Sequence, residues 1–590
     1  MVHSVNDIIF VDSLSAHDVG AVSRLERVCH KREMREGKSY FRDLLTFVDK
    51  TGWGINLGLY AGRRLIGYLI SHEAKESSIS RMPGEYVVYV DDIAIHPEYR
   101  QYFGRLLSAY IRYLRVLYPA HPLEAHGVES IRKLWMKHKQ FFRRNGYELT
   151  ETQPTGKIKQ GEAQYAFRWH PQAQNQGTST ISRQPLRHDR QIYHVNDSAY
   201  SVETWSDEDE WHALIPYWND LLLKTPEPTI FQSYEYQRIW WRHFGLSRSL
   251  LILVIRHGDE VIGIAPLQVG PVLYYGKIFR ELGFIGINWE VDRPKFLFGD
   301  QAEICSTLTA RFLKQNEQRW DLVRLYEQRE DSFVLSGFRD EMHEYGYLTA
   351  VTKDAVAPYL RTDTTWEAYS KSLSARMRKN LKAARKKLGS IGEFEYIECK
   401  SHPDVLEKLS WYEQIEKKSW KGAARVGPSK HGHYYRFYEA LADEFGKTGQ
   451  FHIRFLTLDN QPIAGTFGLE FNNTFYSLHI AHDHEYNKYS LGTLLEYMEL
   501  ESCFNGSCEE YDFLGSFLNN KLRWTSTART SKELHVYQKK WQLVLLFVVY
   551  HRIKPFIKSI IMKVLKDKVQ VLVKFKEKME RAANRRPTDL

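Results

Sequence analysis

The stretch FYSLHIAHDHEYNKYSLGTLLEYMELESC, residues 475–503, gives the clearest indication of the fold. It begins as an alternating strand, passes through a polar turn and continues as a helix. Lys488, Ser490 and Gly492 fall at the predicted helix start, where backbone N–H groups have no helical partner. An ammonium group, a hydroxyl and free N–H groups at that position suit a phosphate or an amide of an extended ligand. The alternative is an ordinary helix N-cap by Ser490.

A β-hairpin pattern precedes this stretch, LTLDNQPIAGTFGLEF at 456–471, with Asp-Asn at its turn. Two other hairpin patterns are similar to it, YAGRRLIGYLIS at 60–71 and IRHGDEVIGIAPLQ at 255–268. Such self-similarity indicates an internal repeat in which one hairpin module is used three times. The sequence therefore predicts an α+β protein with three mixed-sheet units.

Composition divides the chain into five segments. The region 171–200 is rich in Gln, Ser, Thr and Asn and has few large aliphatic residues, which predicts a linker. A weaker seam follows near 345–358, where the apolar pattern is interrupted. The expected segments are a first unit at 1–170, the linker at 171–200, a first half-block at 201–350, a second half-block at 351–538 and a tail at 539–590.

The net charge is concentrated in the tail. The chain has 82 Lys and Arg against 72 Asp and Glu, a formal charge of +10. The tail alone holds 14 basic and 4 acidic residues, so the rest of the chain is neutral. A neutral body argues against a protein built around a large nucleic-acid groove. The 43% of hydrophobic residues excludes global disorder.

The cysteines and the first residues indicate the compartment. Five cysteines are too few for a disulfide framework in a chain of 590 residues. No His pair near Cys503 and Cys508 completes a zinc ligand set, so no metal is expected. The first 20 residues lack the pattern of a signal peptide, which predicts a cytoplasmic protein.

The tail combines apolar and basic residues at near-helical spacing. Its most apolar stretch, WQLVLLFVVY at 541–550, is too short to span a bilayer. A cationic amphipathic helix can lie on an anionic membrane, with about 1 kcal/mol of attraction per basic residue. We therefore expect a peripheral position on the inner face of the membrane. The alternatives are a helix docked on the protein and a dimer contact.

The first unit runs strand, strand, strand, helix, helix, strand from Asp7 to Pro171. The motif QYFGRL opens its first long helix at 101–106. In element order and in this motif the unit resembles the GNAT acyltransferase superfamily, whose diphosphate loop reads [QR]-x-x-G-x-[GA]. The resemblance implies that acyl-CoA pairs with the fourth strand of a splayed mixed sheet, with diphosphate contacts from Gln101, Gly104 and Arg105. Leu106 replaces the second glycine.

The same resemblance concerns the proton-transfer groups of the first unit. Phe142 stands where the superfamily carries a general-acid tyrosine, so Tyr147 is the alternative donor if the unit is active. Asp91 and Asp92 stand where members often carry an acidic base. Strand alternation predicts that only one of the two faces the cleft. The alternative is an Asp that caps the strand end.

The block from 201 to 538 carries four motifs in order. They are FQSYEY at 231–236 followed by WW, SLSARMRKNLKAARKKL at 372–388, DHEYNKYSLGTLL at 483–495 and YDFLGSFLNNKLRW at 511–524. The block resembles the CelD-like acetyltransferases, named for a cellulose-biosynthesis protein and related to the Fem-type aminoacyl transferases with tandem GNAT-like halves. The resemblance implies a catalytic second half that binds acyl-CoA through Lys488, Ser490, Gly492 and Thr493.

Candidate bases lie on two predicted strands of the second half. His482, Asp483 and His484 end a strand where a base would remove a proton from an acceptor, and a His close to an Asp suits that role. The competing interpretation is a solvated strand end. Asp512 lies on a short apolar strand, where a carboxylate must be paired, exposed or functional. We predict that His482, Asp483 or Asp512 is the base.

Candidate substrate-binding residues are basic or aromatic. Lys521, Arg523 and Trp524 can hold an anionic or sugar substrate by charge and stacking. The basic helix at 376–388 buries one apolar stripe and leaves a wide cationic face that includes Arg378 and Lys379. That face can bind a CoA diphosphate, a lipid-linked sugar diphosphate or a tRNA, or only water.

These features together predict a function. We expect an acyl-CoA-dependent N- or O-acyltransferase that moves an acetyl group, or a longer acyl group, to a cell-envelope or exopolysaccharide saccharide or its precursor. Transfer would be direct, in a ternary complex, with backbone amides holding the thioester oxygen. One alternative is a Fem-like transferase that uses aminoacyl-tRNA. Another is a non-catalytic scaffold of a polysaccharide synthesis complex.

Overall fold

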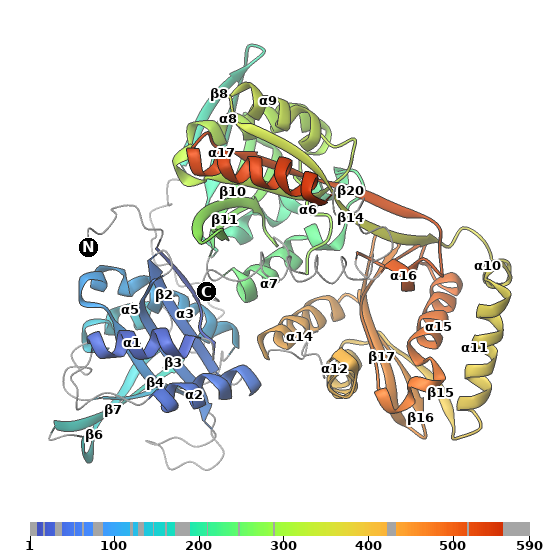
Figure 1. Ribbon diagram of the computed structural model, residues 1–590, viewed down its shortest axis with the longest axis horizontal. Helices are drawn as coiled ribbons and strands as arrows, with labels where there is room; N and C mark the ends of the chain where they lie inside the picture. The colour runs from blue at the N-terminus through green and yellow to red at the C-terminus, as the bar shows by residue number, and fades with distance from the viewer. Residues whose placement is uncertain are drawn as a thin grey trace.

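Two mixed sheets with helices on their faces make up the described part of the chain (Figure 1). The structure is a computed structural model. The residues it describes are 9–15, 18–29, 38–51, 54–61, 64–74, 87–117, 122–127, 135–144, 147–159, 162–171, 189–208, 210–245, 248–286, 290–421, 432–515 and 518–558.

Within the described residues, the first sheet has seven strands in the order β1-β2-β3-β4-β5-β7-β6. Their bounds are β1 Ile9–Ser13, β2 Gly54–Ala61, β3 Arg64–Ala74, β4 Val87–Ile95, β5 Leu123–Gly127, β6 Tyr147–Lys159 and β7 Glu162–Pro171. β4 and β5 pair in parallel over three positions, and the other described pairs are antiparallel. The parallel pair requires a crossover, which the helix after β4 provides.

Helices cover both faces of this sheet. They are α1 (Val19–Cys29), α2 (Lys38–Thr51), α3 (Phe103–Leu117) and α5 (Lys139–Arg144), with the short turn η3 (Pro97–Tyr102) before α3. The buried side of α3 presents Leu107, Tyr110 and Leu114 to one face, at helical spacing. α1 and α2 pack on the opposite face, against Tyr68 and Ile70 of β3.

The described part of the second sheet has thirteen strands in the order β15-β16-β17-β18-β19-β14-β20-β13-β12-β11-β10-β9-β8. Their bounds are β8 Asp189–Val195, β9 Ser198–Trp205, β10 Ser249–His257, β11 Glu260–Tyr274, β12 Lys277–Phe284, β13 Leu322–Gln328, β14 Leu348–Arg361, β15 Phe394–Cys399, β16 Phe451–Leu458, β17 Gln461–Phe471, β18 Thr474–His482, β19 Glu510–Asp512 and β20 Ala528–Tyr537.

The two halves of this sheet exchange strands at its centre. β14 follows the first half and pairs with β19, with Tyr359 opposite Asp512. β20 returns from the second half and pairs with β13, with Val536 opposite Val323. β14 and β20 also pair with each other, and Figure 1 shows them running side by side between the two halves. Each half is therefore completed by a strand that belongs to the other in sequence.

One succession of strands occurs three times. A three-stranded antiparallel meander is followed by a parallel partner in β2-β3-β4-β5, in β10-β11-β12-β13 and in β16-β17-β18-β19. The hairpin patterns of the sequence correspond to β2–β3, β10–β11 and β16–β17. The described structure thus repeats one topology, although it forms two sheets.

The described helices of the second sheet are α6 (Ile215–Lys224), α7 (Tyr234–Phe244), α8 (Ala302–Gln315), α9 (Arg339–Glu344), α10 (Trp366–Ser372), α11 (Ala375–Leu388), α12 (His402–Lys417), α14 (Gly432–Gly446), α15 (Leu491–Asn505), α16 (Leu518–Lys521) and α17 (Trp541–Val548). Single turns precede or follow several of them: η4 (Trp211–Leu214), η5 (Ile230–Gln232), η6 (Gly299–Gln301), η7 (Glu317–Arg319), η8 (Val334–Phe338), η10 (His484–Tyr489) and η11 (Val549–Ile553).

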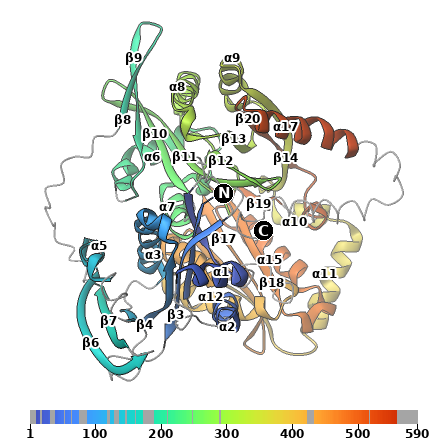
Figure 2. The ribbon, with the colours of Figure 1, turned by 60° about the vertical axis from the view of Figure 1, so that its left-hand side comes forward.

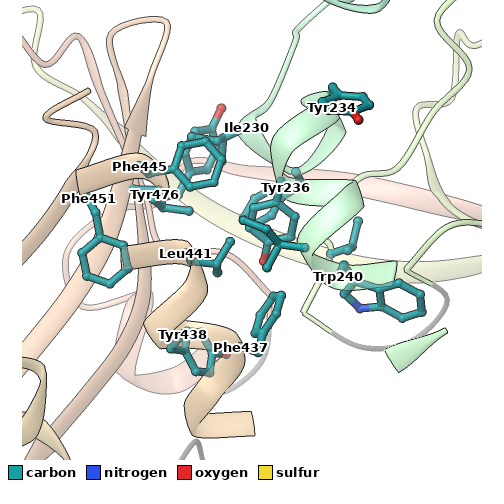
Figure 3. Packing of buried hydrophobic residues seen from close by; sticks show 14 of the residues in the cluster. Ile230, Tyr234, Tyr236, Trp240, Phe437, Tyr438, Leu441, Phe445, Phe451 and Tyr476 are labelled. Atoms are coloured by element: carbon teal, nitrogen blue, oxygen red, sulfur yellow. The ribbon is translucent and has the colours of Figure 1, made fainter. Parts of the chain in front are cut away.

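An aromatic core joins the halves between α7 and α14 (Figure 3). The Tyr236 ring of α7 lies 5.9 Å from Phe437 and 6.4 Å from Phe445 of α14, between ring centroids. Leu441 of the same helix is fully buried among them. Burying an apolar side chain of this size stabilises the fold by roughly 1.5–3 kcal/mol. This core therefore holds the halves together on one side of the sheet.

The first sheet docks on the C-terminus of α7. Arg112 of α3 donates to the carbonyl oxygen of Gly245 at 3.1 Å. Tyr113 donates to the carbonyl oxygen of His243 at 2.8 Å. The last carbonyl groups of a helix lack helical partners and carry partial negative charge, so a guanidinium and a hydroxyl satisfy them well.

The segment predicted as a linker, residues 171–200, forms ordered strands in its second part, where the prediction was wrong. From Asp189 the chain forms β8, an edge strand of the second sheet, and the start of β9, which pairs between β8 and β10. Asn196 and Asp197 form the turn with positive φ values of 49° and 62°, as in a two-residue hairpin. Polar composition concealed this hairpin because its buried side chains, such as Tyr193, are few. Residues 172–188 lie outside the described residues.

Two other predicted boundaries fall on ordered elements. The seam expected near 345–358 is occupied by β14, the strand that joins the halves. The tail expected at 539–590 begins with α17, and residues 559–590 lie outside the described residues. Among the described helices, none has the length and apolar character needed to cross a membrane.

The aromatic core gives a prediction for stability. Replacing Leu441 by Ala should lower the free energy of unfolding by about 2–5 kcal/mol, because it leaves a cavity between the halves. The matched control is Leu223→Ala on α6, where the side chain is 64% exposed and the expected loss is within about 0.5 kcal/mol. Thermal and urea unfolding of both variants measure the difference. Equal losses would contradict a core shared by the halves.

Candidate active site

The strands β18 and β19 separate at their C-terminal ends. They pair in parallel over three positions that end with Tyr476 opposite Asp512. β18 then has a bulge at Leu478, between the register positions of Ser477 and His479. A bulge interrupts the alternation of side chains, so Tyr476 and His479 project from the same face of the strand.

A chain of hydrogen bonds links His479 to the first half of the block. His479 Nε2 lies 2.6 Å from the hydroxyl of Tyr438 on α14. That hydroxyl donates to Oε2 of Glu290, which belongs to the loop after β12. Burial raises the pKa of Glu290, but the hydrogen bonds from His479 and Tyr438 outweigh it and hold that pKa below its ordinary value. The carboxylate therefore stays ionised and orients the other two groups.

Asp512 forms a second contact between the halves. Its side chain is fully buried, and Oδ2 lies 2.5 Å from a guanidinium nitrogen of Arg293 and 3.7 Å from one of Arg529. Oδ1 accepts a hydrogen bond from the Leu514 N–H at 2.8 Å. Both carboxylate oxygens are thus engaged by described partners. A buried charge needs such partners, so Asp512 positions Arg293 and the turn after β19.

Strained backbone marks the same junction. The φ angles of Glu290, Arg293, Glu327 and Leu514 are 56°, 50°, 51° and 58°. Residues of these types rarely adopt positive φ, which costs on the order of 1–3 kcal/mol each. The Arg293 N–H donates to Oε2 of Glu327 at 2.6 Å, which holds two of these residues together. Because strain of this kind gathers at functional sites, the junction is the candidate active site.

Two further ionisable groups lie at the junction with shifted pKa values. Burial raises the pKa of Asp292 to about 6, against the opposing effect of Arg293. Burial lowers the pKa of Lys521. The Lys521 ammonium group donates to the carbonyl oxygens of Leu514 and Gly515 at 3.2 and 2.5 Å. An acid and a base that titrate closer to neutrality suit proton transfer.

The start of α15 lies beside the end of β18. Ser490 has a φ of 54° and its side chain makes no capping hydrogen bond, so it does not act as an ordinary N-cap. A Cβ on Gly492 would lie 3.4 Å from His482 Nδ1. Arg523 donates to Oγ1 of Thr493 at 2.9 Å. The structure thus brings five predicted residues to a helix N-terminus whose N–H groups suit an anion.

Asp483 and Lys488 lie in the turn before α15. Asp483 is buried, accepts a hydrogen bond from the Glu485 N–H at 3.0 Å and lies 3.5 Å from the ammonium group of Lys418. Its carboxylate therefore caps η10 and holds the turn. Lys488 is exposed, with its ammonium group 5.1 Å from the centre of the Tyr489 ring.

The structure places Trp524 away from a substrate surface. Its side chain is buried, and its indole N–H donates to Oε2 of Glu496 at 2.6 Å. A buried indole presents no face on which a sugar could stack. Arg378 and Lys379 lie on the exposed side of α11, whose buried side packs against α15.

The first sheet repeats the bulge of β18. In β4, Asp91 is the additional residue between the register positions of Val90 and Asp92. Asp91 Oδ2 lies 2.7 Å from Nδ1 of His72, and Asp92 Oδ2 accepts a hydrogen bond from the Tyr68 hydroxyl at 3.0 Å. Both carboxylates consequently meet side chains of β3. This differs from the expected alternation, because a bulge places consecutive residues on one face.

The predicted diphosphate residues of the first unit lie around the start of α3. Gln101 and Arg105 are exposed, and a Cβ on Gly104 would meet nothing within 4 Å. Leu106 and Phe142 are both fully buried. The two departures from the GNAT pattern therefore serve the core, and neither side chain meets the solvent.

Sequence reasoning missed the residues that the first half supplies. Glu290, Asp292 and Arg293 lie in one loop, and only the local run EVDR at 290–293 marks it as charged. Tyr438 and His479 look like ordinary members of a helix and a strand. Within the described ranges, no three His, Cys, Asp or Glu residues are grouped as metal ligands.

Comparison with known proteins identifies the class of the second half. Residues 375–521 match a family model described as an acetyltransferase (GNAT) domain. The match begins at the first residue of α11 and ends at the last residue of α16, and it includes His479 and Asp512. It confirms two predictions: the chain is an acyltransferase, and its donor is an acyl-CoA. No curated protein sequence matches the chain.

Solved structures resemble the chain only distantly. FemX is 10% identical, with a TM-score of 0.40 over 61% of this chain and 100% of its own. A protein of unknown function from Bacteroides thetaiotaomicron is 9% identical, with a TM-score of 0.37 over 57% of this chain and 99% of its own. A tandem GNAT protein from the clavulanic acid biosynthesis pathway is 12% identical, with a TM-score of 0.33 over 58% and 99%.

The contact between Trp524 and Glu496 gives a prediction for pH dependence. Burial raises the pKa of Glu496 to about 7. In the unfolded chain a Glu ionises near about pH 4.3, so at intermediate pH the folded state binds the extra proton. The stability from this group is present at low pH and is lost as the pH rises towards about 7.

Glu496→Gln removes the titrating group and keeps an acceptor for the indole, so the melting temperature should vary less between about pH 5 and 7. Melting curves across this range measure the effect. Glu367→Gln, at a side chain that is 84% exposed, is the control and should change nothing. An unchanged slope in Glu496→Gln would count against the raised pKa.

Proposed function

We propose that the junction of the two halves is the catalytic centre of an enzyme that transfers an acetyl group from acetyl-CoA to a saccharide. The acceptor is an amine or hydroxyl of a cell-envelope or exopolysaccharide saccharide or its precursor. The observation that carries this proposal is the series of hydrogen bonds that links Glu290, Tyr438 and His479. It lies at the point where β18 and β19 separate. Tyr438 and His479 lie on the segment that matches an acetyltransferase domain, and Glu290 is supplied from outside that segment.

His479 is the base in this proposal. Glu290 accepts the hydrogen of the Tyr438 hydroxyl, so the hydroxyl oxygen accepts a hydrogen from Nε2 of His479. The neutral ring then carries its lone pair on Nδ1, which can take the proton of the acceptor as that acceptor attacks the thioester. The ionised Glu290 stabilises the imidazolium that forms, through Tyr438.

The donor is proposed to lie between β18 and β19, as an added strand would. Its diphosphate meets the N-terminus of α15 near Ser490, Gly492 and Thr493, where backbone N–H groups favour an anion. Lys521, whose ammonium group donates to the carbonyl oxygens of Leu514 and Gly515, is proposed to give a proton to the departing thiolate. Asp292, with a pKa of about 6, can return it.

The chain is proposed to contain three GNAT-like units, a single one followed by a CelD-like pair. The repeated topology supports this division, and so does the exchange of β14 and β20, since each half needs the other's strand. β12 has no bulge in its pairing with β11, unlike β4 and β18. The first half of the pair therefore supports the second without a comparable centre of its own.

His479→Gln should lower kcat for acetyl transfer by about 10²–10⁴-fold with little change in KM for acetyl-CoA, because it removes the base. His482→Gln is the matched control on the same strand, and it should keep kcat within about tenfold, since His482 contacts the helix start and not the Glu290 chain. Steady-state kinetics of the release of CoA from acetyl-CoA measure both. Equal losses would place the base elsewhere.

A Fem-like transfer from aminoacyl-tRNA is the second candidate. It is favoured by α11, where seven basic side chains lie exposed: Arg376, Arg378, Lys379, Lys382, Arg385, Lys386 and Lys387. Thermal stabilisation by a charged tRNA that disappears at high salt, without stabilisation by acetyl-CoA, would favour this candidate. Stabilisation by neither would favour a non-catalytic scaffold of a polysaccharide synthesis complex.

The enzyme is proposed to work in the cytoplasm, on the inner face of a membrane. α17 buries Leu543 and Leu546 against the sheet. Its outer side exposes Trp541 by 72% and Leu545 by 56%, in a stripe that continues to Val548. Figure 2 shows α17 along an edge of the molecule. An exposed apolar stripe beside basic residues fits an anionic bilayer surface.

A membrane contact of this kind predicts that Trp541→Ser with Leu545→Ser lowers the binding of the full chain to vesicles by at least about tenfold, because two apolar side chains no longer leave water. Co-sedimentation with vesicles of phosphatidylcholine and phosphatidylglycerol measures it. Ile192→Ser on β8, at a side chain that is 67% exposed, is the control and should bind like the parent chain. Binding that survives the double substitution would exclude α17 as the contact.

A further inference from the structure

Three side chains of the first sheet lie together where β4 and β5 separate. The parallel pairing of these strands ends with Val90 opposite Ala125. Tyr89 lies directly opposite His72 in the register of β3 and β4, with ring centroids 5.9 Å apart. Asp91, the bulge residue, follows on the same face. The three side chains therefore lie at the bulge of β4 and just before it, and Asp92 is the residue that corresponds to His479 of the second half by register.

His72 and Asp91 form a polar pair with the geometry of a general base. Nδ1 of His72 lies 2.7 Å from Oδ2 of Asp91, and the two side chains are 29% and 9% exposed. The hydrogen bond to Asp91 raises the pKa of His72. A carboxylate that accepts the hydrogen of Nδ1 fixes the tautomer in which Nε2 has the lone pair. A well-covered carboxylate behind a more accessible imidazole is the arrangement that proton abstraction requires.

Tyr89 is the candidate acid of this site, since Tyr147, the alternative donor, is buried in the core. Phe142 occupies the position where the GNAT pattern has a tyrosine, and it is buried. Burial, Asp91 and Glu124 raise the pKa of the Tyr89 hydroxyl to about 12. The hydroxyl therefore keeps its proton at neutral pH and can give it to a thiolate, which is a stronger base than the carboxylates nearby.

The other ionisable groups described on this face contact one another or remain uncharged. Tyr68 donates to Asp92, and burial raises its pKa well above the ordinary value. Burial also raises the pKa of Cys29 at the end of α1 to about 11. Glu26 of α1 is buried, and its charge contributes to the raised pKa of Tyr68. Among the described side chains of this face, His72 is therefore the one expected to change charge between pH 6 and 9.

We propose that the first unit is a second acyl-transfer centre, in which His72 is the base, Asp91 its positioning residue and Tyr89 the acid. The acceptor amine or hydroxyl loses its proton to Nε2 of His72 and forms a bond to the thioester carbon. The carbon–sulfur bond breaks, and the sulfur takes the proton of the Tyr89 hydroxyl. The proton on His72 then returns to the tyrosinate through water, so the protein is unchanged and CoA leaves as the thiol.

This inference uses the acyl-CoA donor of the proposed function and none of its residues. Either centre can therefore be absent without the other. The two centres lie on different sheets, and the first sheet meets the second block through Arg112 and Tyr113, which contact the end of α7. An enzyme with two centres can acylate two positions or two acceptors in one chain.

The test is the release of CoA from acetyl-CoA by the full-length protein, with glucosamine as acceptor and with water alone. We expect His479→Gln to retain a measurable rate of CoA release. The double variant His72→Gln, His479→Gln should release CoA at least tenfold more slowly than His479→Gln, with an unchanged KM for acetyl-CoA. The retained rate should rise with pH, because the base acts when it is unprotonated. Asp91→Asn in the His479→Gln background should move the inflection of the curve of rate against pH to lower pH. It should also lower the rate at the plateau of that curve.

The control is Tyr68→Phe in the His479→Gln background. It removes the hydrogen bond to Asp92 and should leave the inflection of the curve of rate against pH unchanged. No release by His479→Gln at any pH would overturn the proposal, as would a remainder that His72→Gln does not change. If instead His479→Gln loses nothing while His72→Gln abolishes release, the first centre stands and the proposed centre of the second half fails. Asp91→Asn serves as the second probe if His72→Gln does not fold.

Discussion

The antiparallel pairing of β14 with β20 is the contact on which the rest of the second block depends. Each strand completes the sheet of the half to which it does not belong in sequence. The pairing holds β19 next to the loop after β12, so that Asp512 meets Arg293 across the junction. A buried carboxylate without its guanidinium partner would cost on the order of 3–5 kcal/mol. Separation of the halves would therefore expose an aromatic core and leave a buried charge unpaired.

The same junction explains why the candidate site can hold a strained backbone. Glu290, Arg293 and Leu514 keep positive φ angles because hydrogen bonds from both halves determine their positions. The bulge in β18 also shapes the site, because it turns Tyr476 and His479 to one face at the point where the parallel pair ends. A flat strand would have sent one of them to the other face. Strained backbone and bulge thus lie together at the point where β18 and β19 separate, which is where the proposed base His479 is found.

Local pattern predicted the three hairpins, the start of α15 and the exposed cationic side of α11, because period and turn chemistry depend on neighbouring residues. It also marked His482, Gly492, Thr493 and Arg523, which the structure brings together. It could not indicate that Asp483 caps a turn or that Trp524 is buried on Glu496. Those outcomes depend on which side chain happens to lie within hydrogen-bond distance after folding.

The sequence by itself determined the class of the protein: an acyltransferase with repeated mixed-sheet hairpins, an acyl-CoA donor and a basic tail. Such properties follow from motifs and composition, which can be recognised in the sequence before any tertiary contact is known. Only the tertiary structure decided that β8 and β9 belong to the sheet, that the halves exchange strands, and that Glu290 and Tyr438 reach His479. The physical reason is sequence separation. Glu290 and His479 lie almost two hundred positions apart, and only the pairing of β14 and β20 brings their loops to one edge.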